Sequence, residues 1–175
     1  MRIKPTSWGP PLVITSMLGA FSPGALAQIV SNGGFEIPLV APGSATYTAG
    51  QSFGGWTVDL GNISLNNECC TGNSFSGLQS AYLSGTFHQD LNTLVGAQYA
   101  LSYARGCSCD AIHHHEVLLS WGTESVTNRF TELGWGRSSY IFVAADVTTR
   151  LSFTGMDILL DDVLLSQWHR LHSQP

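Results

Sequence analysis

Hydrophobic and polar residues alternate in short runs along most of this chain, and no segment keeps a helical apolar period for three turns. Residues 56–60 read Trp-Thr-Val-Asp-Leu, and residues 99–104 place Tyr, Leu and Tyr between Ala, Ser and Ala. Successive side chains of a strand point to opposite faces, so each of these runs offers one face to a core. The pattern predicts β-strands.

Further β-prone runs continue to Ser166 and are separated by residues typical of turns, among them Ser84-Gly85 and residues 134–136. These candidate strands are residues 81–83, 86–91, 116–121, 125–130, 138–144, 149–154 and 158–166. About ten short strands in a chain of this length favour an all-β sandwich or jelly roll. Only a short polar tail, residues 167–175, follows them.

The N-terminus has the order of a secretory signal peptide. Arg2 and Lys4 precede an apolar stretch over residues 12–21, and Ala25-Leu26-Ala27 offers small residues at a cleavage site. The apolar run is shorter than the roughly 20 residues that span a bilayer. We therefore expect a signal peptide over residues 1–27, a secreted sandwich domain over 28–166, and the tail over 167–175.

The net charge of the part expected to be secreted limits the classes of partner that it can bind. Without Arg2 and Lys4 the chain keeps twelve acidic residues but only five arginines and no lysine, a net charge of about −7. Polyanions repel such a surface, which argues against nucleic acid and anionic membranes as partners.

Several motifs occur in the order found in one bacterial family. They are residues 32–38 (NGGFEIP), 53–58 (FGGWTV), 61–63, 83–85, 87–91, 96–101, 134–135, 140–142 and 160–163. In these motifs the chain resembles the choice-of-anchor C family, and its frame is similar to carbohydrate-binding modules and to a plant cell-wall family. The resemblance implies a galactose-binding-like jelly-roll β-sandwich of two antiparallel sheets. Family members usually carry a C-terminal anchoring signal, whereas this sequence ends without an apolar tail, so we expect no stable membrane anchor.

The resemblance also implies a structural calcium ion held by Glu36 near the first strand and by Asp161 on the last, with Asp162 as a further candidate ligand. Asp161 and Asp162 interrupt the apolar run 158–165, and alternation places them on opposite faces, so one carboxylate should be partly buried. Calcium requires six to eight oxygen ligands, so backbone carbonyls or water must complete the shell. The alternative is that Glu36 and Asp161 cap turns or pair with Arg150.

Four cysteines stand as two close pairs, Cys69 with Cys70 and Cys107 with Cys109. Export makes disulfides the expected state. Adjacent cysteines rarely bond each other without strain, so we expect two bridges between the two loops. Zinc is the rival interpretation, but neither spacing has the usual two-residue gap between ligands.

His113, His114 and His115 lead into the strand-like run 116–121. A zinc hydrolase needs two histidines four apart on a helix, whereas on a strand only His113 and His115 share a face. We expect a solvent-facing loop or strand start, with adventitious metal binding as the alternative.

Sugar binding normally needs an exposed aromatic ring beside hydrogen-bonding groups. Trp56, Trp135 and the tyrosines of run 99–104 are assigned to the core, which leaves Phe75, Tyr47 and Trp121 as possible ligand contacts. No nucleophile elbow or catalytic carboxylate pair is recognisable, so we expect no enzyme. The expected function is a secreted bacterial module that binds a polysaccharide or other cell-wall or matrix glycan. A structural or interaction protein of the envelope is the alternative, and an extracellular hydrolase the third.

Overall fold

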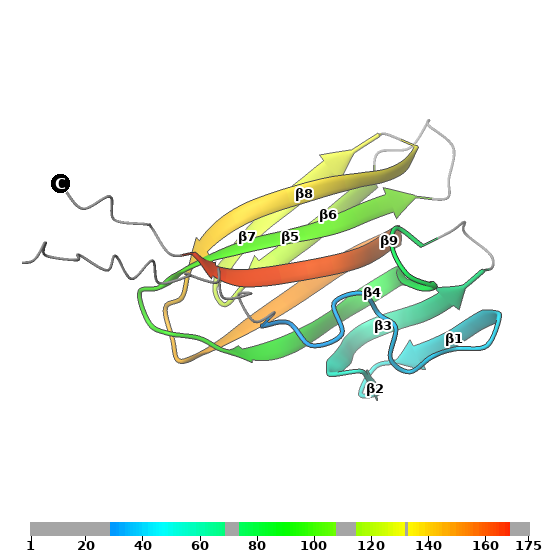
Figure 1. Cartoon of the computed structure of the whole chain (residues 1–175), viewed down its shortest axis with the longest axis horizontal. Coiled ribbons are helices and arrows are strands. Elements are labelled where there is room, and N and C mark those ends of the chain that lie inside the picture. The colour runs from blue at the N-terminus through cyan, green and yellow to red at the C-terminus, as the bar shows by residue number, and fades with distance from the viewer. Residues whose placement is uncertain (1–28, 69–73, 108–114, 132, 169–175) are drawn as a thin grey trace, which may run out of the picture.

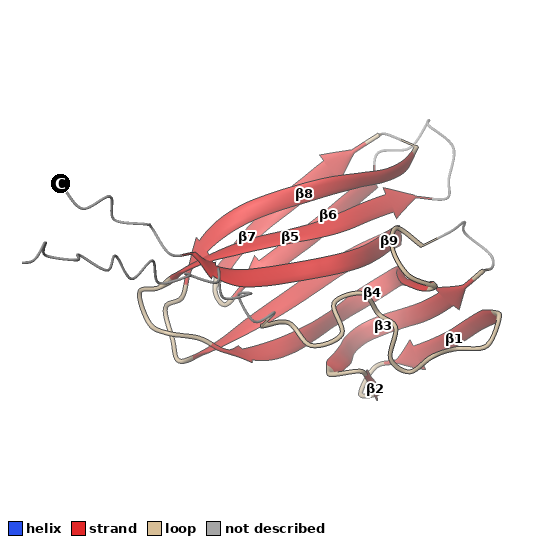
Figure 2. Cartoon of the chain, viewed as in Figure 1, coloured by secondary structure: helices blue, strands red, loops and turns tan. Residues whose placement is uncertain are grey.

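The computed structural model describes residues 29–68, 74–107, 115–131 and 133–168, and every regular element in them is a β-strand (Figure 2). The strands are β1 (Gly43–Thr48), β2 (Ser52–Phe53), β3 (Trp56–Asn67), β4 (Gln79–Asn92), β5 (Gln98–Cys107), β6 (His115–Trp121), β7 (Glu124–Phe130), β8 (Gly134–Val143) and β9 (Thr148–Trp168). No helix long and apolar enough to cross a membrane occurs in these ranges. The expected all-β class is confirmed.

The strands form two antiparallel layers that share β9. The N-terminal half of β9 lies between β4 and β6, and β3, β1 and β7 extend this layer outward. The C-terminal half of β9 pairs with β5, which pairs with β8. Figure 1, viewed along the shortest axis, shows β8, β5 and the red end of β9 in front of the other layer. The chain is therefore a sandwich whose layers are joined through one long strand.

The core lies between the layers and is rich in aromatic rings. Trp56 and Phe87 stand 4.9 Å apart between ring centroids, Phe35 and Phe153 each lie about 6 Å from them, and all four are fully buried. Such tilted and stacked contacts add to the free energy gained from burying apolar area. Trp56, Tyr99 and Tyr103 were expected in the core, and the structure confirms them there.

The NGGFEIP motif forms a turn that closes the core at the N-terminal end. Asn32 Oδ1 accepts from the Ile37 amide at 3.0 Å and its Nδ2 donates to the Ile37 carbonyl, while the Asn32 carbonyl accepts from Trp56 Nε1 at 3.1 Å. Phe35 takes a positive φ of 57° inside this turn and so reaches the core. The motif thus has a structural explanation.

The predicted strand boundaries were wrong in several places. Ser84-Gly85 is not a turn but lies inside β4, where a register shift against β9 follows Leu83, and Gly134 begins β8. Two pairs of predicted strands are therefore the single strands β4 and β9. β9 also runs two residues past the expected end of the domain, since Gln167 and Trp168 pair with β5. β1 was not anticipated.

Candidate functional site

The outer face of β5 forms the floor of a groove. Tyr99, Leu101 and Tyr103 point into the core, so the alternate residues Ala100 and Ser102 face outward. Both outward side chains are small. Larger residues stand on the neighbouring strands at the same level: Ile141 on β8 and Leu164 and Trp168 on β9. A strand of small residues between two strands of large ones is a trough.

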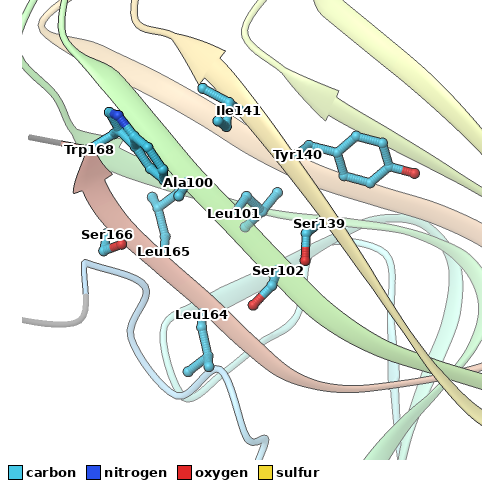
Figure 3. Close-up of a pocket in the computed structure, with 10 residues that line it drawn as sticks. All are labelled: Ala100, Leu101, Ser102, Ser139, Tyr140, Ile141, Leu164, Leu165, Ser166 and Trp168. Atoms are coloured by element: carbon cyan, nitrogen blue, oxygen red, sulfur yellow. The ribbon is translucent and has the colours of Figure 1, made fainter. Parts of the chain in front are cut away.

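This β5 groove has a volume of about 770 Å³ and combines apolar walls with hydroxyl groups. Figure 3 shows Ser102 with Ser139 of β8 and Ser166 of β9 beside the apolar side chains. The Trp168 indole is 47% exposed at one end of the groove. An apolar cleft with a few polar groups and an accessible aromatic ring has the usual chemistry of a small-molecule or glycan site.

A second aromatic group stands at the other end of the β5 face. Arg137 lies two residues from Ser139 along β8, donates from Nη1 to Ser102 Oγ at 3.3 Å and forms an ion pair with Asp162. Its guanidinium also lies 4.9 Å from the Phe75 ring centroid. The Phe75 ring in turn meets Trp135 edge-on at 5.9 Å. Gln98, which pairs with Trp168, and Gly106, which pairs with Trp135, are eight residues apart, or about 27 Å along the strand.

The loop that carries Phe75 is held by two carboxylates. Asp161 Oδ2 accepts from the amides of Phe75 and Ser76, both at 2.9 Å, and Glu36 Oε1 accepts from the amides of Leu78 and Gln79 at 2.8 and 3.0 Å. The Asp161 side chain is fully buried. Desolvation raises its pKa to about 6, against the opposing effect of the amide hydrogen bonds.

The contacts of these carboxylates bear on the calcium prediction. Glu36 and Asp161 act on the same short loop: their oxygens accept hydrogen bonds from backbone N–H groups, so the two carboxylates cap the loop, and an N–H donor cannot bind a cation. This is the capping alternative, while Arg150 pairs with Asp90 instead. Asp162 faces Arg137 and does not share the position of the other two. Within the described ranges no group of three or more His, Cys, Asp or Glu side chains is placed to hold a metal. Calcium stays a prediction, with Glu36 and Asp161 as the residues that fit it.

The other residues predicted as ligand contacts lie in different surroundings. Phe75 is 40% exposed, so it is accessible beside the groove. Trp121 was wrongly placed among the contacts: it is 2% exposed, stacks with Phe142 and donates from Nε1 to the Val143 carbonyl. Tyr47 is half-buried against Phe53 at 4.8 Å between centroids, on β1 and away from β5.

Few of the cysteines and histidines fall within the described residues. Cys69, Cys70, Cys109, His113 and His114 lie outside them, as does the expected signal peptide. Cys107 is buried at the end of β5, so one member of the expected bridges stands beside the Trp135 end of the groove. The pairing stays a prediction. His115 does begin a strand, but it is buried against Phe130 and does not face solvent as expected.

The main groove residues were missed at the level of sequence. Trp168 was assigned to the tail, and Ile141, Leu164 and Arg137 were not singled out. The alternation of small residues along 99–104 was the available clue, because a strand without large outward side chains leaves a hollow. Trp135, expected in the core, is only half-buried beside Phe75.

Comparison with known proteins agrees with the fold. No protein-family model matches the chain, and no curated protein matches its sequence. Among solved structures, the chain resembles the xylan-binding CBM22-1 domain of Xyn10C from Paenibacillus barcinonensis, with a TM-score of 0.51 and 11% identity over 73% of this chain and 97% of that one. The tandem CBM22-1–CBM22-2 structure of the same enzyme gives a TM-score of 0.51 and 12% identity over 86% of this chain and 48% of that one. The chain therefore has the β-sandwich fold of carbohydrate-binding modules. The more specific choice-of-anchor C resemblance stays a prediction.

Proposed function

We propose that this protein is a secreted, non-catalytic carbohydrate-binding module whose ligand lies in the β5 groove. The observation that carries the proposal is the floor of small residues between apolar and hydroxyl-bearing walls, with Trp168 exposed at one end. An aromatic ring packs against the apolar face of a sugar, and the serine hydroxyls exchange hydrogen bonds with its hydroxyl groups. The fold shared with a xylan-binding module supports the same class of ligand by analogy.

The shape and charge of the groove indicate an extended, uncharged glycan. The β5 face is open along the strand, so a chain can lie across several rows of side chains. Arg137 is neutralised by Asp162, and the groove residues themselves carry no charge. The net negative charge of the whole protein disfavours polyanionic glycans.

Secretion, disulfides and a structural calcium ion complete the proposal. They are supported by the N-terminal sequence, by the paired cysteines and by the convergence of Glu36 and Asp161 on one loop. Each can be tested on exported protein: N-terminal sequencing reports cleavage after Ala27, thiol labelling of the unfolded, non-reduced chain reports pairing, and elemental analysis reports calcium. Two or more reactive thiols would contradict full pairing.

Binding to a polysaccharide panel tests the function. Xylan, β-mannan, galactan, cellulose and peptidoglycan should be compared with the anionic polymer pectate by affinity electrophoresis and calorimetry. We expect one or more uncharged polymers to bind, and Trp168→Ala to weaken that binding about 10- to 100-fold, because an aromatic contact is lost. Val147→Ala is the matched control, since Val147 is exposed in the loop before β9 and outside the groove. Unchanged binding by Trp168→Ala would remove the β5 groove as the site.

The alternative is a structural or interaction protein of the envelope, and the exposed apolar side chains of the same face favour it. Ile141, Val143 and Leu164 are all exposed there and would suit a flat protein partner. If no polymer binds and the chain instead self-associates or precipitates through this face, this alternative replaces the proposal. Product release from any polymer in the panel would favour the third candidate, a hydrolase.

A further inference from the structure

A second groove lies on the outer face of the other layer, across β3, β4, β9 and β6. Its volume is about 800 Å³, close to that of the β5 groove. Gly61, Gly85 and Gly155 lie side by side in its lining, paired in register across three strands. A Cβ on Gly61 would lie 2.2 Å from the Ser84 carbonyl oxygen, and one on Gly85 2.0 Å from that of Leu60. Side chains are therefore excluded at Gly61 and Gly85 by the close approach of the two strands, while a Cβ on Gly155 would point toward the core, 3.1 Å from Ile158.

The rows on either side of the glycines supply both apolar and hydroxyl groups. Leu60 and Met156 are 68% and 67% exposed, and Leu118 stands exposed on β6. Between them the hydroxyls of Thr86 and Thr154 are hydrogen-bonded to each other at 2.9 Å across the strands. Exposed apolar contacts beside aligned hydroxyls suit the alternating apolar and polar faces of a sugar ring.

The charged groups of this groove define the class of ligand further. Glu116 lies on its rim, 3.1 Å from Arg129, and Asp157 accepts from the Tyr82 hydroxyl. Carboxylates accept hydrogen bonds from sugar hydroxyls but repel anions. The part of the chain expected to be secreted has no lysine to attract an anion, because the only lysine of the sequence is Lys4. The groove is therefore suited to a ligand rich in hydroxyl donors and without negative charge.

We propose that this second groove binds an uncharged polysaccharide and that the protein is a bivalent, non-enzymatic cross-linker of glycan chains. The proposal rests on the proposed function, because it assigns the same class of ligand to a second face. The two grooves lie on the outer faces of opposite layers, and β9 lines both, Thr154–Asp157 in one half and Leu164–Trp168 in the other. Figure 1 shows the two layers joined by β9. One extended chain cannot occupy both faces without wrapping the domain, so two chains are brought together.

Matched blocking variants test the two grooves separately. Ala100→Phe fills the β5 groove and Thr154→Phe fills the second groove; both positions are outward-facing and in mid-strand, where an aromatic residue is tolerated. The full secreted chain is titrated calorimetrically with xylohexaose, cellohexaose and mannohexaose, and the turbidity of the matching long polymers reports cross-linking. Melting curves confirm that each variant folds. Glu116→Gln keeps the shape of the second groove and serves if Thr154→Phe does not fold.

We expect two hexasaccharides per wild-type chain, one per chain in either blocked variant, and none in the double variant. Turbidity should fall at least tenfold in each single variant. A wild-type stoichiometry of one that only Ala100→Phe abolishes would overturn the second site and leave the proposed function intact. Two sites that Thr154→Phe leaves unchanged, or a sugar-independent dimer that it dissolves, would also overturn the proposal. If no hexasaccharide binds, both proposals fall together.

Discussion

The grooves on the two outer faces of this sandwich have different floors. On the β5 face the floor consists of small side chains, Ala100 and Ser102, on an ordinary strand. On the β4 face it includes Gly61 and Gly85, whose backbones approach so closely that no Cβ fits. Substitution of a floor residue therefore changes the shape of the first groove without disturbing strand pairing, whereas at Gly61 or Gly85 it disturbs the pairing itself.

The two faces also differ in the position of their charged groups. The ionic groups of the β5 face stand at one end of the groove, where Arg137 and Asp162 pair. The β4 face continues from its groove into a line of ionisable side chains in which His88 Nδ1 lies 2.8 Å from Asp59 and Arg150 pairs with Asp90. Changes of salt concentration or pH should therefore alter side-chain interactions along the length of the sheet on the β4 face. On the β5 face they should alter mainly the interactions near the loop that carries Phe75.

The largest expected effect comes from enlarging one residue of each floor by a single heavy atom. Gly85→Ala places a Cβ 2.0 Å from the Leu60 carbonyl oxygen and 3.0 Å from the Asn62 nitrogen, so the strands must separate. We expect a loss of about 3 kcal/mol in the free energy of unfolding. Ala100→Ser, on the other floor, should change it by less than about 0.5 kcal/mol. Urea unfolding of both variants measures the difference, and equal stabilities would contradict the distinction drawn between the floors.

The second effect concerns Asp161, which holds the Phe75 loop at the end of the β5 face. Burial raises its pKa to about 6 from the ordinary value near 3.8, so the folded state binds the proton more tightly than the unfolded state. This contribution to stability is fully present below about pH 3.8 and is lost as the pH rises through about 6, by up to about 3 kcal/mol. Calcium would favour the charged form and reverse the trend.

Unfolding measured from pH 4 to 7, in chelator and in calcium, tests this behaviour. The difference in stability between wild type and Asp161→Asn isolates the carboxylate from other titrating groups. In chelator the difference should move against the wild type as the pH rises, and in excess calcium it should not. An identical profile with and without calcium would exclude the ion from this loop, and a flat profile in chelator would contradict the raised pKa.

The fold could be predicted from sequence because it depends on alternation. The pattern of residues 99–104 identified β5 and its buried face, and Trp56 was assigned to the core for the same reason. The bulges were not predictable in this way. Asp162 has a positive φ of 48° within β9, and the pairing of β9 with β5 shifts beside it, so a count of alternate positions fails there. Ser84-Gly85 was taken for a turn because local composition does not reveal that another glycine pairs with it.

The site was less predictable, because it is made of residues from three strands. Ile141, Ala100 and Trp168 meet only through strand pairing over 69 positions of sequence, and each is unremarkable alone. Phe75 was chosen for its polar loop, and this choice brought it near the correct end of the groove. Trp121 was named only because it had not been assigned to the core, and it is buried, so an aromatic residue left out of the core assignments is not thereby exposed.

A smaller effect is expected at Phe75, which tests whether the β5 site reaches the Arg137 end. Phe75→Ala removes the edge contact with Trp135 and the cation–π contact with Arg137, so the free energy of unfolding should fall by about 1 kcal/mol. If the glycan extends along the strand, its affinity should fall by a similar amount. Leu78→Ala is the control, since Leu78 is exposed in the same loop. Stability lost without any loss of affinity would confine the site to the Trp168 end.

The smallest expected effect distinguishes the ion pairs of the two faces. Arg150 donates to both Asp90 oxygens at 2.8 and 2.9 Å, and this hydrogen bonding lowers the pKa of Asp90, yet both side chains are about half exposed. Exposed pairs contribute little, so Asp90→Asn should cost about 0.5 kcal/mol near pH 7. Because the pKa is lowered on folding, this contribution exists above the unfolded pKa and disappears as the pH falls through the folded one.

Salt separates this pair from its counterpart on the other face. In 1 M NaCl the effect of Asp90→Asn should vanish, because the screening length falls to about 3 Å. Arg137 and Asp162 are less exposed, and Arg137 also contacts Phe75 and Ser102, so Arg137→Gln should keep most of its effect in salt. Urea unfolding of both variants at 0.05 M and 1 M NaCl provides the comparison. Equal salt dependence would mean that Arg137 acts at the end of the β5 groove through its charge alone and that its packing against Phe75 contributes nothing.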